Sequence, residues 1–136
     1  MPVRFGPQLI GQTEKSLSAL LLRILDGRLT EPQWVALRLA QALDGDLADD
    51  AALAAAVADR ARFADASGLV DTLVAAGLVA AGRPTPRGRE LVAAVQDEIA
   101  ATTAPVWKGL DEADVAAAGR VLDEVLRRTR VVLAGG

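Results

Sequence analysis

The stretch FADASGLVDTLVAAGLVAAGRPTP, residues 63–86, decides the fold of this chain. Residues 63–76 repeat hydrophobic side chains every three or four positions, which is the period of an amphipathic helix. Gly77 then supplies the left-handed backbone conformation that ends a helix. The apolar run at 78–81 is too short for another helix. We therefore predict one short strand there, broken by the turn residues at 82–84.

The same helical period recurs on both sides of this stretch. It predicts further helices at 8–26, 31–43, 47–59, 86–105 and 111–133. Thr30 and Gln33 have the spacing of a capping box around Pro32, which marks the start of the second helix. We expect Pro105 to end or kink its helix. The two helices before the strand, joined by a tight turn, are the arrangement of a helix-turn-helix with the beginning of a wing.

Length and composition exclude several classes of function. With 136 residues and 51% hydrophobic residues, we treat 1–136 as one domain with its own core. The chain has no Cys, His or Tyr, which removes thiolate and imidazole metal sites and histidine-based nucleophilic catalysis. We expect no catalytic residue, no metal and no cofactor. No apolar run is long enough for a membrane span and the first residues lack the pattern of a signal peptide, so we expect a cytoplasmic protein.

Hydrophobic stripes on the first and last helices point to a second chain. The other elements are too short and too few to cover both stripes, so we expect a homodimer. Residues 30–84 would form the helix-turn-helix lobe, and residues 6–27 and 85–133 the dimerisation helices. The expected fold class is mainly α: a winged helix-turn-helix-like domain with a much shortened β-wing, plus N- and C-terminal dimerisation helices.

Three segments, taken in their order and spacing, resemble the MarR family of bacterial winged helix-turn-helix regulators. They are 29–34 (LTEPQW), 68–79 (GLVDTLVAAGLV) and 85–91 (TPRGREL), and 109–114 (GLDEAD) resembles the cap before the last helix of that family. The resemblance runs from about Leu29 to Arg128. It implies a dimeric, ligand-responsive transcriptional regulator in which one helix enters the major groove of double-stranded DNA, a β-wing meets the minor groove, and an effector binds between the lobes.

Cationic and polar residues around the expected recognition helix are the candidate DNA contacts. The three arginines at 83, 87 and 89 form the most concentrated basic cluster of the chain, as a nucleic-acid interface requires. The complete set is Arg60, Arg62, Ser67, Thr72, Arg83, Arg87 and Arg89. The alternative is a solvated surface, in which Arg60 and Arg62 answer neighbouring carboxylates and the hydroxyls have no ligand. The acidic residues at 44–50 are interpreted as caps and solubilising charge.

Trp34 and Arg38 are the candidate ligand-binding residues. They lie one helical turn apart, so an indole face and a guanidinium would share one side of the helix. Such a pair suits a small aromatic or anionic effector. The competing interpretation places Trp34 in the core, since a buried aromatic on a helical stripe needs no ligand to explain it.

A second function stays open on the sequence alone. The expected recognition helix contains Asp65 and Asp71 but no Lys or Arg, while affinity for duplex DNA depends largely on cations that meet phosphates. The wing is also much shortened. The alternative is a degenerate family member that keeps the dimer and the inter-lobe cavity, has lost DNA recognition, and acts as a small-molecule-binding protein or a repurposed enzyme.

Overall fold

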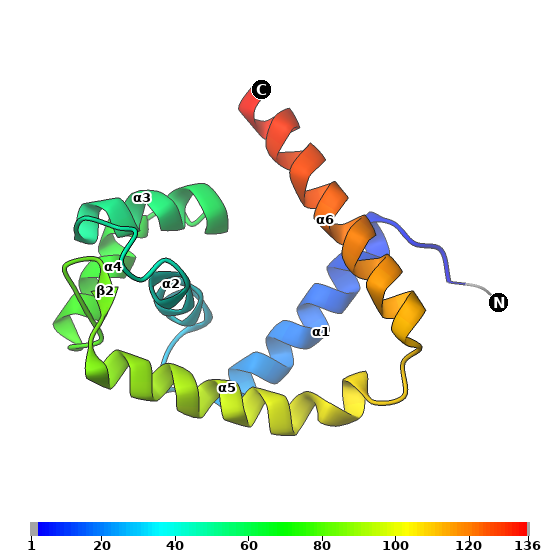
Figure 1. The fold of residues 1–136 in the computed structure, drawn as a ribbon, viewed down its shortest axis with the longest axis horizontal. Coiled ribbons are helices and arrows are strands. Elements are labelled where there is room, and N and C mark those ends of the chain that lie inside the picture. The colour runs from blue at the N-terminus through cyan, green and yellow to red at the C-terminus, as the bar shows by residue number, and fades with distance from the viewer. Residues whose placement is uncertain (1–2, 136) are drawn as a thin grey trace. The chain divides into compact units, whose positions relative to one another are not determined.

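The computed structural model describes residues 3–135, and this part of the chain is mainly helical, as predicted (Figure 1). The helices are α1 (Pro7–Leu25), α2 (Glu31–Ala42), α3 (Asp50–Ala61), α4 (Ala66–Ala75), α5 (Pro86–Trp107) and α6 (Glu112–Gly135), and the strands are β1 (Val79–Ala80) and β2 (Arg83–Pro84). The chain packs as two compact units that divide between Thr102 and Thr103. The first unit holds α1–α4, the strands and most of α5, and the second holds α6.

Side-chain caps determine where three of the helices begin. Thr30 and Gln33 form the predicted capping box at α2: the Gln33 amide donates to Thr30 Oγ1 at 3.2 Å and the Thr30 amide donates to Gln33 Oε1 at 2.9 Å. Helix α3 begins at Asp50 rather than at residue 47, because Asp49 accepts a hydrogen bond from the Ala52 amide. Helix α4 begins at Ala66 rather than at residue 63 for the same reason, with Asp65 as the cap.

The core of the first unit forms where α2, α3 and α4 pack against one another. Helix α2 contacts both α3 and α4, and the latter two contact each other most extensively. The largest fully buried side chains are Leu25, Leu37, Leu53, Leu73, Val57, Val70, Val79, Val92 and Val95. They come from five helices and β1, so removing a Leu from this core would cost roughly 2–5 kcal/mol of stability.

The two strands form a hairpin where one strand was predicted. They are antiparallel, with Val79 opposite Pro84. Ala81 and Gly82 connect them with φ of 52° and 75°, and two consecutive positive φ values are typical of the tight hairpin turn that matches the strand twist. Asp50 Oδ1 accepts a hydrogen bond from the Gly82 amide at 2.7 Å, which ties the turn to the start of α3. The hairpin is closed, but each strand has only two residues.

The first turn of α5 lies directly against Leu78, the residue before β1. Gly88 is buried, and a Cβ added there would be 2.2 Å from the Leu78 carbonyl oxygen. Thr85 fixes the approach, because its Oγ1 donates to the Gly77 carbonyl at 2.6 Å and accepts from the Gly88 amide at 3.1 Å. Pro105 does not end the helix, which continues to Trp107.

Arg28 connects the end of α1 to α5. Its Nη2 and Nε donate to the Ile24 and Leu25 carbonyl oxygens at 2.6 and 3.0 Å, which satisfies two acceptors at the end of α1. The same guanidinium meets both carboxylate oxygens of Glu98 at 3.1 and 2.9 Å. This two-pronged pair fixes the α1–α2 loop on α5.

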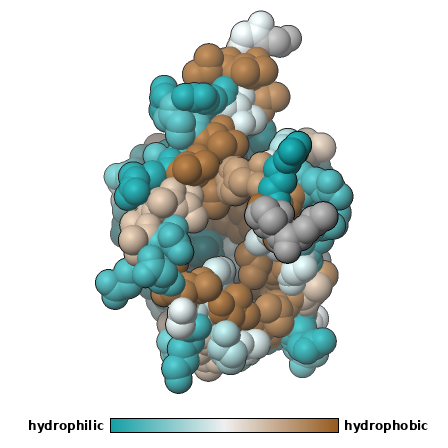
Figure 2. Space-filling view, turned by 90° about the vertical axis from the view of Figure 1, so that its right-hand side faces the viewer, coloured by the Kyte–Doolittle hydropathy of each residue, from teal (hydrophilic) through white to brown (hydrophobic). Residues whose placement is uncertain are grey.

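The second unit presents an apolar stripe to solvent. Asp111 caps α6 by accepting from the Asp114 amide at 3.1 Å, as its place in the sequence predicts. No residue of α6 is buried, and Leu126 is 58% exposed. The exposed hydrophobic side chains of α6 are Val115, Val121, Leu122, Val125, Leu126, Val131, Val132 and Leu133. Figure 2 shows hydrophobic residues reaching the surface of the chain. Among residues 3–135, no helix combines enough length and hydrophobicity to cross a membrane.

Candidate DNA-facing surface and ligand cavity

Helix α4 presents a polar outer face without cations. Ser67, Asp71 and Thr72 are exposed on it, while Val70 and Leu73 are buried on the opposite side. The Thr72 hydroxyl already has two partners: it donates to the Leu69 carbonyl at 2.6 Å and accepts from Gln33 Nε2 at 3.1 Å. Ser67, the second residue of α4, is the other exposed hydroxyl of this face.

Arg62 lies in the turn that joins α3 to α4. It is the C-cap residue of α3, with a left-handed backbone at φ 60° and ψ 29°, and it is exposed. The left-handed conformation ends α3 and turns the chain toward the Asp65 cap of α4. No ion pair within residues 3–135 involves Arg62. It thus places an uncompensated positive charge just before the N-terminus of α4.

Asp44 brings together two arginines of the predicted basic cluster. Arg83 Nε donates to Asp44 Oδ1 at 2.6 Å, and Arg89 Nη2 lies 2.7 Å from Asp44 Oδ2. The hydrogen bond from Arg83, followed by that from Arg89, lowers the pKa of the Asp44 carboxyl below its usual value of 3.8. The carboxylate is therefore charged at neutral pH and compensates part of the charge of the cluster.

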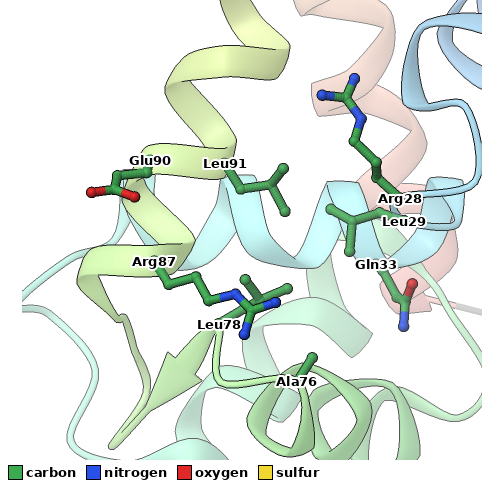
Figure 3. A pocket seen from close by; sticks show the side chains of 8 residues that line it. All are labelled: Arg28, Leu29, Gln33, Ala76, Leu78, Arg87, Glu90 and Leu91. Carbon is green, nitrogen blue, oxygen red and sulfur yellow. The ribbon is translucent and has the colours of Figure 1, made fainter.

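Arg87 belongs to a different environment from its two neighbours. It lines a cavity of about 530 Å³ with residues of the α1–α2 loop, of α2, of the turn after α4 and of α5, which are Arg28, Leu29, Gln33, Ala76, Leu78, Glu90 and Leu91. Figure 3 shows the Arg87 side chain extending over Leu78 toward Ala76, while Glu90 points away from it. Arg28 is already paired with Glu98, so Arg87 is the cation of this cavity that no ion pair in the described part of the chain compensates.

Trp34, Arg38 and Arg60 line one cavity of about 420 Å³. Trp34 and Arg38 come from α2 and Arg60 from the last turn of α3, and Leu21 of α1 contributes to the wall. The Arg38 guanidinium carbon lies 6.0 Å from the centroid of the Trp34 ring, within the range of a cation–π contact. The structure thus groups both predicted ligand-binding residues with Arg60, which the sequence places among the DNA contacts.

Two aspartates that were interpreted as caps and solubilising charge make long-range contacts to the basic cluster and the hairpin. Asp44 compensates Arg83 and Arg89, and Asp50 holds the hairpin turn through the Gly82 amide. Both interactions join residues more than 30 positions apart, since Asp50 and Gly82 differ by 32 and Asp44 and Arg83 by 39. Local spacing carries no signal for such pairs.

Within the residues that the structure describes, no three Asp, Glu, His or Cys side chains lie close enough together to hold a metal ion.

Comparison of the chain with protein-family models, with curated proteins and with solved structures finds no match.

Proposed function

We propose that this chain is a dimeric, ligand-responsive, DNA-binding regulator of transcription with a winged helix-turn-helix lobe. The observation that carries the proposal is the packing of α2, α3 and α4 with a closed hairpin directly after α4. In a helix-turn-helix lobe the second helix of the pair enters the major groove and meets base edges with its N-terminal residues. Helix α4 is the second helix of the α3–α4 pair, and it keeps one polar face exposed.

The proposed DNA contacts differ in how readily they become available. Arg62 before α4 and Arg87 after the hairpin have no ion pair in the described part of the chain, so they meet phosphates directly. Ser67 adds a hydroxyl at the start of α4. Arg83 and Arg89 bind phosphate only when the phosphate replaces Asp44, which makes their contribution an exchange of one anion for another.

The proposed dimer buries the exposed stripe of α6 against a second copy. An uncovered stripe of this length on a helix with no buried residue is typical of an interface rather than of a free surface. Two copies related by a twofold axis present two α4 helices to half-sites about one helical turn apart, roughly 34 Å, on DNA. The effector occupies the cavity of Trp34, Arg38 and Arg60.

Fluorescence anisotropy tests the proposal directly. The full chain is titrated onto a duplex from the region upstream of its own gene and onto a scrambled duplex, each across a salt series. We expect tighter binding to the first duplex and an affinity that falls steeply with salt, because released counterions drive phosphate binding. Arg62→Asn, which tolerates a left-handed backbone, and Arg87→Gln should each weaken binding and flatten the salt slope by about one. Arg23→Gln removes the same charge from α1 and should change neither.

A second candidate function is favoured by the Asp44 pairs. If Asp44 retains Arg83 and Arg89 against DNA, the remaining cations are too few for phosphate-driven binding, since α4 contributes none. The chain is then a small-molecule-binding dimer without DNA recognition. If the chain binds neither duplex at low salt and a ligand raises its Tm, this second function is supported and the proposed DNA-binding regulator is excluded.

A further inference from the structure

The cavity of Trp34, Arg38 and Arg60 combines uncompensated positive charge with an aliphatic wall. Neither Arg38 nor Arg60 takes part in an ion pair within residues 3–135, and no carboxylate lines the cavity. The other lining residues are apolar and include Leu21, Val35 and Leu39. The cavity has a volume of about 420 Å³, which is within the range of small-molecule sites, about 300–1,000 Å³.

Trp34 supports Arg38 and offers little surface to a ligand. Only 3% of Trp34 is exposed, so the indole belongs to the core. The Arg38 guanidinium lies over its ring, with the guanidinium carbon 6.0 Å from the ring centroid. Trp34 therefore restricts where Arg38 can place its positive charge, in the manner of a positioning residue. This separates the roles of the two residues that the sequence analysis joined in one stacking site.

The remaining surface of the cavity determines the class of ligand. Apart from Trp34 and the two arginines, the lining residues in the described part of the chain are aliphatic, so a bound hydrocarbon would meet mainly branched and methyl side chains. Guanidinium groups bind carboxylates through charge-assisted hydrogen bonds, and branched aliphatic side chains pack against methylene groups. We infer that the cavity binds a small aliphatic monocarboxylate, whose charge lies between Arg38 and Arg60 and whose chain packs on Leu21, Val35 and Leu39. Arg60 is then a ligand-binding residue and leaves the set of expected DNA contacts, in which Arg62 remains.

This inference deepens the proposed function, because it names the chemical class of the effector. It is tested on the full chain without DNA, with octanoate as the probe. Calorimetry should show saturable binding of octanoate, and octanol, which has the same chain length and no charge, should bind at least tenfold more weakly. Benzoate should also bind more weakly than octanoate. Arg38→Gln and Arg60→Gln should each lower the affinity for octanoate at least tenfold, while Arg23→Gln leaves it unchanged.

The two tryptophans locate the site independently of affinity. On addition of octanoate, the indole N–H resonance of Trp34 should shift, while that of Trp107, in the second unit, should stay in place. Circular dichroism of each variant establishes that it is folded before its affinity is compared. An unchanged affinity in Arg60→Gln, equal binding of octanol, or tighter binding of benzoate would each overturn the inference.

The outcomes also separate this inference from the proposed function. Sequence-dependent duplex binding with no octanoate binding would remove the ligand class and leave the regulator in place. Octanoate binding that depends on both arginines, without binding to either duplex, would sustain the inference and favour the second candidate function.

Discussion

Asp44 and Arg83 lie 39 residues apart in the chain, yet Arg83 Nε donates to Asp44 Oδ1 at 2.6 Å. Arg89 meets the other oxygen of the same carboxylate. One aspartate from the loop after α2 thus joins β2 and the first turn of α5, the two elements that carry the basic cluster. The strength of these two ion pairs decides whether Arg83 and Arg89 are available to DNA.

Removing the charge of Asp44 should strengthen DNA binding. In Asp44→Asn, Arg83 and Arg89 lose their shared anion and become available to phosphates. Two added phosphate contacts would steepen the plot of log affinity against log salt by about two. Anisotropy titrations across a salt series measure this change. Asp46→Asn alters the net charge equally at an exposed position with no ion pair among the described residues, so a D44N variant that binds no better than D46N would contradict the prediction.

The Asp44 carboxyl should titrate below its usual pKa of 3.8, because both arginines stabilise its charged form. A lowered folded-state pKa means that the stabilisation is fully present above pH 3.8 and is lost as the pH falls through the lowered value. NMR titration of the side-chain carboxyl measures the pKa directly. Arg83→Ala removes the hydrogen bond that lowers the pKa most, so the pKa of Asp44 should move back toward 3.8. A carboxyl that titrates identically in both proteins would show that Arg83 and Asp44 are not paired in solution.

Gly82→Ala should destabilise the protein more than Gly77→Ala does. Both glycines have positive φ, 75° and 74°, so alanine pays a similar backbone cost of about 1 kcal/mol at either position. Only at Gly82 would the new Cβ meet backbone, 2.5 Å from the Asp49 carbonyl oxygen, whereas Gly77 has open space around it. Urea denaturation of the two variants isolates this clash. Equal losses of stability would show that the hairpin turn does not lie against α3.

Leu126→Glu should break the proposed dimer. The side chain is 58% exposed on α6, so burying it in an interface would be favourable and replacing it with a carboxylate would not. Sedimentation velocity should show a shift from dimer to monomer at concentrations where the wild-type chain is dimeric. Lys108→Gln changes the net charge by the same amount before the start of α6 and should leave the dimer intact. A monomeric wild-type chain would end the proposal that α6 pairs with a second copy.

The sequence predicts what depends on neighbouring residues and misses what depends on distant ones. The capping box of Thr30 and Gln33 is a local pattern, and α2 begins where that pattern places it. The start of α4 was predicted too early, because hydrophobic periodicity continues through Phe63 while the Asp65 cap decides the boundary. Strand β2 was missed because Pro84 argues against a strand, although an edge strand tolerates it where no amide donor is needed.

The candidate site follows the same division. Trp34 and Arg38 share a helix face, so their grouping was predictable from a spacing of four. Arg60 joins them only because α3 packs on α2, and its sequence position beside Arg62 suggested the opposite role. The compensation of Arg83 and Arg89 by Asp44 depends in turn on the path of the loop after α2, which no local pattern encodes.

The close approach of Gly88 to Leu78, just before β1, limits how this sequence can diverge. With only 2.2 Å between a would-be Cβ and the Leu78 carbonyl oxygen, every substitution at this position must displace either the hairpin or the start of α5. A Cβ added at Gly11 would have no atom within 4 Å, so other residues fit there. Descendants of the same ancestral gene should therefore differ at position 11 and retain glycine at position 88. A conserved glycine there would help to identify remote relatives even after most other residues have changed.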